Sequence, residues 1–196
     1  IAQTLSREGS APYIIYNGAS SARGALGYIE AAAEIWEQIS SNAESAAIRN
    51  VCIPGGNGGL AAGFIYGTAL LGNPFHVELI SVEHEAEPLR EIISAFLEDL
   101  EKLCGVPMPC PLEQTATLHG AYRFGGWGVI TPEVEEFCIR FARTEGIFIE
   151  KVYTCKTLYG MCDLAKKGYF HDGACYLHSG GIGALFSQYH IPGGGV

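Results

Sequence analysis

Charged residues are scarce in this sequence, and basic residues are the scarcer kind. Only 17% of the 196 residues are charged, and 12 Lys and Arg stand against 21 Asp and Glu, which gives a formal net charge of −9. This balance argues against a nucleic-acid partner, because neutralising phosphates takes clustered Lys and Arg. A hydrophobic content of 48% excludes a disordered chain.

Long apolar runs, a signal peptide and paired cysteines are also missing. No apolar stretch is long enough to cross a bilayer, and the N-terminus lacks the pattern of a secretory signal. The seven cysteines form no CxxC pair and are odd in number, which favours free thiols over a zinc site or a disulfide framework. We therefore expect a cytoplasmic protein with no metal and no membrane partner.

The most informative stretch is a glycine run between an apolar strand and a small-residue helix. Residues 51–66 read VCIPGGNGGLAAGFIY. Glycine permits turns that are closed to other residues, and the first amides of a helix have no partner within it. Those amides and the helix dipole favour a bound phosphate or carboxylate. The alternative is a plain strand-to-helix turn that binds nothing.

Strands and helices alternate along the chain. Apolar runs predict strands at residues 13–16, 51–54, 76–82, 147–150 and 174–178. Helical spacing of apolar residues predicts helices at 26–39, 60–71, 89–103, 132–145 and 158–167, with a short helix after them. The proline- and glycine-rich segment 105–130 is predicted to be irregular. This order favours an α/β fold, a three-layer and mostly parallel open sheet with helices on both faces.

In such folds ligands bind beyond the carboxyl ends of the strands. That rule selects the loops at residues 17–21, 55–59, 83–84, 153–157 and 179–181. Tyr153 and Thr154 bring a phenol and a hydroxyl there, and Ser179 brings a hydroxyl before two glycines. Taken singly, a tyrosine at a strand end is more often a core residue and such a serine a turn, and we interpret His178 as structural. Their joint placement on one edge favours a site.

Six short motifs share the order and spacing of one enzyme family. They are Gly18-Ala-Ser-Ser21, Gly55-Gly-Asn-Gly-Gly59, Ala142-Arg-Thr-Glu-Gly146, Val152-Tyr-Thr-Cys-Lys156, Gly168-Tyr-Phe170 and His178-Ser-Gly-Gly181. From about Pro12 to Tyr189 the chain resembles the D-cysteine desulfhydrases and 1-aminocyclopropane-1-carboxylate deaminases. These are pyridoxal 5'-phosphate enzymes of the tryptophan-synthase-β fold type, which act on small amino acids and release ammonia and a 2-keto acid.

The resemblance implies a role for each motif. The phosphate of the cofactor would bind Gly55, Gly56, Asn57, Gly58 and Gly59. Ser179 would face the pyridine nitrogen, and Tyr153 and Thr154 would border the ring and the substrate as catalytic residues. Residues 1–17 would end a small domain with a crossover strand, 18–190 would form the cofactor-binding large domain, and 191–196 a loose tail.

The departures from the family pattern concern acid–base groups and lysine. Trp127 stands about where the family has an active-site tyrosine, and Glu150-Lys151 replaces an Asp-Pro pair. The lysines are Lys102, Lys151, Lys156, Lys166 and Lys167, and none has the family's Schiff-base context. The resemblance therefore implies that another chain or segment supplies an N-terminal section with that lysine. A sheet without its N-terminal strands would expose an apolar edge that needs a partner, so we also expect an oligomer.

Two other functions are open at this point. The chain could be a non-catalytic relative that acts by binding or interaction. It could also be an NAD-binding domain of the Rossmann type, with Gly56, Gly58 and Ala61 as the fingerprint and Glu83 as the ribose-binding acid.

Overall fold

The computed structural model of the protein describes residues 1–188. From β1 onward, each strand is followed by one or two helices, and two short 3-10 turns, η1 and η2, also occur in the chain. The elements are α1 (Ala2–Arg7), η1 (Asn17–Ala19), α2 (Ala22–Ser41), β1 (Asn50–Gly55), α3 (Gly59–Leu70), β2 (His76–Ser81), α4 (Ala86–Cys104), α5 (Leu112–Thr115), β3 (Ala116–His119), η2 (Gly120–Tyr122), α6 (Pro132–Glu145), α7 (Thr154–Lys166), β4 (Ala174–Tyr176) and α8 (Ile182–Gln188).

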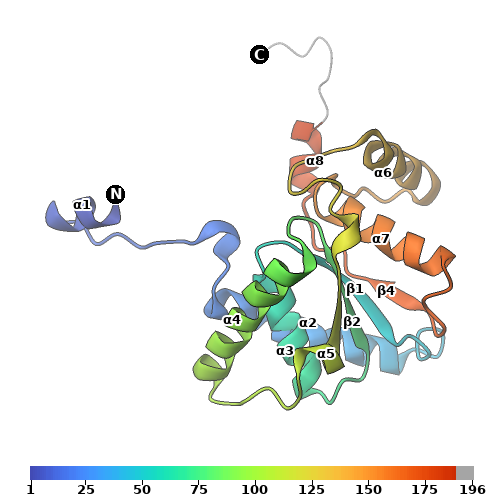
Figure 1. Cartoon of the computed structure of the whole chain (residues 1–196), viewed down its shortest axis with the longest axis horizontal. Coiled ribbons are helices and arrows are strands. Elements are labelled where there is room, and N and C mark those ends of the chain that lie inside the picture. The colour runs from blue at the N-terminus through green and yellow to red at the C-terminus, as the bar shows by residue number, and fades with distance from the viewer. Residues whose placement is uncertain (189–196) are drawn as a thin grey trace, which may run out of the picture.

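The strands form one parallel sheet in the order β3-β2-β1-β4. Helices α2, α3 and α4 cover one face, and α6 and α7 lie on the other (Figure 1). Strands β1 and β2 are buried over all but their first residue, as expected for strands covered on both faces. The predicted α/β architecture is confirmed.

Two predicted strands are absent, and those two predictions were wrong. Residues 13–16 form an extended arm outside the sheet, and Tyr13 is 85% exposed because no neighbouring strand among the described residues pairs with it (Figure 1). Residues 147–150 are buried in part but leave the sheet. The carbonyl of Phe148 accepts from His178 Nε2 at 2.8 Å, and that of Ile149 from Cys138 Sγ at 3.0 Å, so these carbonyls bind side chains.

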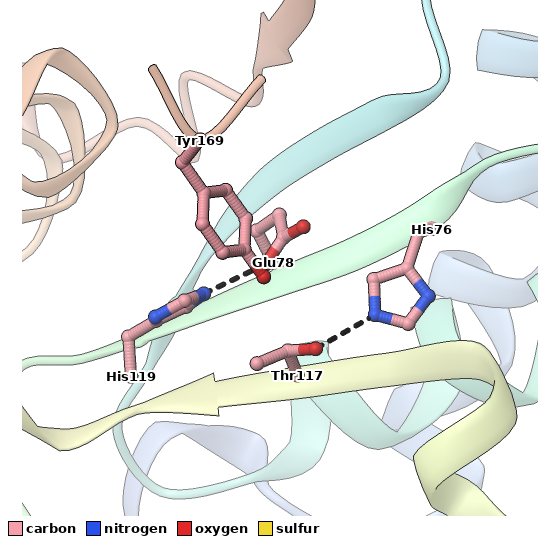
Figure 2. Close-up of polar contacts among 5 residues, drawn as sticks. All are labelled: His76, Glu78, Thr117, His119 and Tyr169. Carbon is pink, nitrogen blue, oxygen red and sulfur yellow. Dashed lines mark hydrogen bonds and ion pairs between the residues drawn. The ribbon is translucent and has the colours of Figure 1, made fainter. Parts of the chain in front are cut away.

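One strand was missed. Strand β3 lies in the segment predicted to be irregular and forms the edge of the sheet beside β2. Polar pairs join the two strands (Figure 2): Glu78 Oε2 lies 2.7 Å from His119 Nε2, and His76 Nε2 lies 2.8 Å from Thr117 Oγ1. Four residues with two polar pairs give too weak an apolar pattern to be recognised as a strand.

The remaining boundaries differ from the predictions by a few residues. Helix α7 begins at Thr154 instead of residue 158, and β4 ends at Tyr176 instead of residue 178. The predicted tail at 191–196, like the end of the predicted domain at 190, falls outside the described residues. Within residues 1–188, every helix is too short or too polar to traverse a lipid bilayer.

Candidate functional site

A pocket of about 300 Å³ lies beyond the carboxyl ends of the central strands. It is lined mainly by residues 18–20, 56–61 and 179–181, with Tyr28, Glu150 and Tyr153. Segments that are distant in the sequence therefore meet at one edge of the sheet, as expected for ligand sites of open parallel sheets. The volume suits a small ligand.

The glycine run forms the floor of this pocket. Gly58 is the N-cap of α3 and has φ 91°, a conformation that favours glycine, and no side chain caps the helix. Gly59, Leu60 and Ala61 line the pocket, so the amides of the first turn, which have no partner within the helix, are at its wall. The arrangement provides backbone donors and the positive end of a helix dipole for an anion.

Tyr153 forms one side of the pocket and lies directly against the glycine run. A Cβ atom at Gly56 would come within 3.0 Å of Tyr153 Cε1, so the absence of a side chain there lets the ring lie close to the backbone. The phenol oxygen of Tyr153 accepts a hydrogen bond of 2.5 Å from Trp127 Nε1. Burial raises the pKa of Tyr153 from its ordinary value, against the opposing effect of the Trp127 hydrogen bond, so the phenol keeps its proton near neutral pH.

Glu150 is a pocket residue that sequence reasoning did not select. It is 2% exposed, and its carboxylate accepts from the amides of Val152, Tyr153 and Thr154 at 2.7, 2.5 and 2.7 Å. The side chain thereby caps the N-terminus of α7 and orients the backbone of Tyr153. An acidic residue just before a helix was the available signal, but it was masked by the predicted strand at 147–150.

The structure brings six of the eight predicted site residues to the pocket. Gly56, Asn57, Gly58, Gly59, Tyr153 and Ser179 line it. Gly55 lies below them at the end of β1. Thr154 is 1% exposed and sits behind the wall, where its hydroxyl accepts from the Glu150 amide at 2.7 Å.

His178 lies beside the pocket in the structural role that was predicted for it. Its Nε2 binds the Phe148 carbonyl, and its Nδ1 accepts from the Gly180 amide at 3.2 Å. Both ring nitrogens are therefore engaged in holding the backbone next to Ser179.

No lysine lies among the pocket residues, although all five lysines are within the described part of the chain. Lys102, Lys166 and Lys167 are exposed, and Lys151 forms an ion pair with Glu135 at 2.6 Å. Lys156 is fully buried, and its Nζ donates to the carbonyls of Arg123 and Gly126 at 2.9 and 2.8 Å. Burial lowers the pKa of Lys156, and Glu150 opposes this effect.

Glu83, the acid of the dinucleotide hypothesis, lies next to the glycine run. Its Oε2 atom is 3.7 Å from the position of a Cβ at Gly56 and 3.8 Å from His84 Nε2. That oxygen is buried and has no hydrogen-bond partner among the described residues.

The fold and the pocket define an α/β protein with a pocket at a helix N-terminus, at the carboxyl edge of a parallel sheet. Residues 1–180 match the sequence family described as pyridoxal-phosphate dependent enzymes, and the chain belongs to that family. The predicted family and cofactor are thus confirmed, and the match favours pyridoxal phosphate over a dinucleotide.

Individual relatives agree with the family match. The chain is 33% identical over 186 residues to a Pyrococcus horikoshii protein provisionally named 1-aminocyclopropane-1-carboxylate deaminase, covering 95% of this chain and 54% of the relative. It is 34% identical over 197 residues to a D-cysteine desulfhydrase of Salmonella paratyphi C, covering 97% and 56%. The crystal structure of an ACC deaminase homologue superposes with a TM-score of 0.80 at 30% identity, covering 96% and 57%. The chain therefore spans a little over half the length of these relatives.

The pocket fits the group that the family requires. The first turn of α3 offers amides for a phosphate, with Ser20 and Asn57 as polar neighbours. Glycines at 56, 58, 59, 180 and 181 leave room for a flat ring near the backbone, and Ser179, which also lines the pocket, carries a hydroxyl.

Proposed function

We propose that this chain is the cofactor-binding part of a pyridoxal-phosphate-dependent amino-acid lyase or deaminase, of the D-cysteine desulfhydrase or 1-aminocyclopropane-1-carboxylate deaminase type. The observation that carries the proposal is the pocket itself, in which the first turn of α3, Tyr153 and Ser179 meet. When bound, pyridoxal phosphate supplies an electron sink for bond breaking at the α-carbon of an amino acid.

The residues of the chain have distinct tasks in this proposal. The amides of residues 56–59 bind the phosphate, and the Ser179 hydroxyl meets the pyridine nitrogen as a neutral partner. Tyr153, which holds its proton at neutral pH, donates to a substrate or ring atom above the glycine run. Thr154, behind the wall, acts on the substrate only through the backbone that it orders.

We further propose that another polypeptide or segment supplies the lysine that links covalently to the cofactor. Support comes from the five lysines, none of which lies among the pocket residues, and from the share of the relatives' length that this chain spans. The exposed apolar arm at residues 13–16 offers a surface for such a segment, which also supports an oligomer. The seven free cysteines support a cytoplasmic location.

Titration of the chain with pyridoxal phosphate and with pyridoxal tests the proposal. We expect the phosphorylated compound to bind at least about tenfold more tightly, because only its phosphate can use the helix N-terminus. Gly59→Asp places a carboxylate among those amides and should abolish this preference. Gly27→Asp is the matched control, since Gly27 lies on the exposed face of α2 with open space around it. Equal affinities for the two compounds in the unmodified chain would refute the phosphate site.

Borohydride reduction followed by mass analysis tests the source of the lysine. We expect no adduct on this chain alone, and an adduct on the complementary polypeptide once the two are mixed. A stable adduct on one of the five lysines of this chain would contradict the proposal.

A non-catalytic binding protein is the second candidate, favoured by the same absence of a lysine from the pocket lining. The two functions differ in one result. If the chain retains phosphate-dependent binding but no N-terminal section of a relative restores ammonia release from D-cysteine or 1-aminocyclopropane-1-carboxylate, the binding function is the correct one.

A further inference from the structure

Lys156 is a buried cation that takes no direct part in the pocket. It lies on α7, one turn after Tyr153, and is 0% exposed. Its ammonium group donates to two main-chain carbonyls, those of Arg123 and Gly126. Burying an ammonium group costs free energy unless its donors are satisfied, so these two bonds join α7 firmly to the loop that contains both carbonyls.

That loop has an unusual backbone. Phe124, Gly125 and Gly126 have φ values of 53°, 94° and 121°, three successive residues in a region that side chains disfavour. A non-glycine residue such as Phe124 keeps this conformation only when surrounding contacts impose it. Trp127 follows immediately, and it is 57% exposed, so burial contributes little to its placement.

Trp127 in turn determines which way the Tyr153 hydroxyl can donate. The indole Nε1–H is a donor only, so in the 2.5 Å contact the phenol oxygen is the acceptor. The hydroxyl proton of Tyr153 must then point elsewhere, and the phenol lies on the pocket wall. A tyrosine in place of Trp127 could accept this proton; a tryptophan cannot.

We propose that Lys156 is a positioning residue: by clamping residues 123–126 it keeps the Trp127 indole on the Tyr153 oxygen, and so directs the Tyr153 hydroxyl proton into the pocket. The proposal rests on the proposed function, in which the pocket binds the cofactor and the substrate. The linkage from Lys156 through Trp127 to Tyr153 can be measured without any cofactor.

The sequence provides a direct readout, because it contains only two tryptophans. In the 15N-indole spectrum of the full chain, Trp127→Phe assigns the Trp127 signal and leaves that of Trp36. We expect the Trp127 Nε1–H of the unmodified protein to exchange with solvent at least about tenfold more slowly than a free indole, as a hydrogen bond predicts. Lys156→Met, which keeps the bulk and removes the donors, should abolish this protection and shift the signal.

Two further variants separate positioning from general stability. Lys166→Met, at an exposed lysine of the same helix, should leave the Trp127 signal unchanged. Lys156→Gln retains a donor and should restore part of the protection. A folded Lys156→Met protein with an unchanged Trp127 signal would overturn the proposal. If Lys156→Met does not fold, exchange in the unmodified protein decides. A Trp127 Nε1–H that exchanges as fast as that of free indole overturns the linkage. A protected Nε1–H that loses part of its protection in Lys156→Gln supports it.

Pyridoxal phosphate titration then tests the effect on the pocket. Lys156→Met and Trp127→Phe should each weaken binding several-fold, and the double variant should be no weaker than the poorer single variant, because both act through one contact. Additive losses would overturn the common route. Absence of binding in the unmodified chain would reject the proposed function, while the indole exchange would still report on the linkage.

Discussion

At the scale of one residue, Glu150 has two roles: its side chain caps the N-terminus of α7 and also lines the pocket. Its carboxylate accepts three consecutive amides at the start of α7 and also lines the pocket. Negative charge at a helix N-terminus is favourable, and here the charge is desolvated, which strengthens the interaction. The same bonds hold the main chain of Tyr153, so the phenol and the cap are coupled.

Replacing this charge should be measurable in stability. We expect Glu150→Gln to lower the free energy of unfolding by about 1–2 kcal/mol, because the amide keeps the shape but loses the charge and one acceptor. Urea unfolding followed by circular dichroism measures the change. Glu145→Gln, at an exposed position near the end of α6, should change stability by less than about 0.5 kcal/mol. Equal losses in the two variants would show that the cap contributes nothing.

At the scale of the element, edge strand β3 is attached to the sheet by polar side chains in addition to its backbone ladder. Glu78 on β2 is 1% exposed, and it binds His119 at 2.7 Å and the Tyr169 hydroxyl at 3.4 Å (Figure 2). Glu78 pairs with Thr117 in the strand register, and His119 with Ile80, so the carboxylate and the imidazole are diagonal neighbours. Removing one partner leaves a buried carboxylate with fewer partners.

We therefore expect His119→Leu to destabilise the protein by about 3 kcal/mol. The double variant Glu78→Leu with His119→Leu should recover most of this loss, since no buried charge is left. Thermal or urea unfolding of the three proteins provides the comparison. His76→Leu is the matched control on the same pair of strands, because His76 contacts an uncharged hydroxyl and should cost less. A double variant less stable than the single one would contradict the assignment of the cost to Glu78.

At the scale of the whole molecule, buried thiols and phenols make the fold sensitive to alkali. Burial raises the pKa of Cys52 above the ordinary thiol value of 9.0, and a hydrogen bond with Cys138 together with burial raises that of Cys155. Burial also raises the pKa of Tyr176, and a hydrogen bond to Glu133 raises that of Tyr159 to about 12. The folded chain therefore keeps protons that the unfolded chain loses.

The sign of the effect follows from this difference. The stabilising contribution of these groups is complete below their ordinary pKa values and is lost as the pH rises towards the raised ones. Lys156 has the opposite sign, since its pKa is lowered by burial and stability from it rises with pH. The buried thiols and phenols outnumber this single lysine, so we expect the free energy of unfolding to fall above about pH 9. At about pH 10 each buried thiol should account for a loss of about 1 kcal/mol.

Melting temperatures between about pH 7 and about pH 11, with reductant present, measure this loss. Cys52→Ala should reduce the slope above about pH 9, whereas Cys104→Ala, at an exposed thiol, is the matched control. A melting temperature that stays level across this range would refute the prediction.

Local patterns were sufficient for much of the fold and for part of the site. The periodicity of α2 and α4, the buried runs of β1 and β2, and the glycine run between β1 and α3 are each contained in a few consecutive residues. The rule that ligands bind at the carboxyl ends of strands also selected Tyr153 and Ser179. It holds for Ser179, which follows β4, whereas Tyr153 follows a predicted strand that is absent and reaches the pocket at the start of α7.

Contacts between distant segments were needed for the rest. Residues 13–16 and 147–150 have the composition of strands, but a strand exists only where a neighbour completes its ladder, and Ala116–His119 became one because β2 lies beside it. The pairing of Trp127 with Tyr153 and the clamp of Lys156 on residues 123–126 span about 30 positions of sequence. Composition and spacing therefore predicted an α/β protein, and the resemblance of its six short motifs to one enzyme family indicated the pyridoxal-phosphate type. Tertiary packing decided which side chains face the pocket, because hydrogen bonds between distant residues form only where the fold brings their segments together.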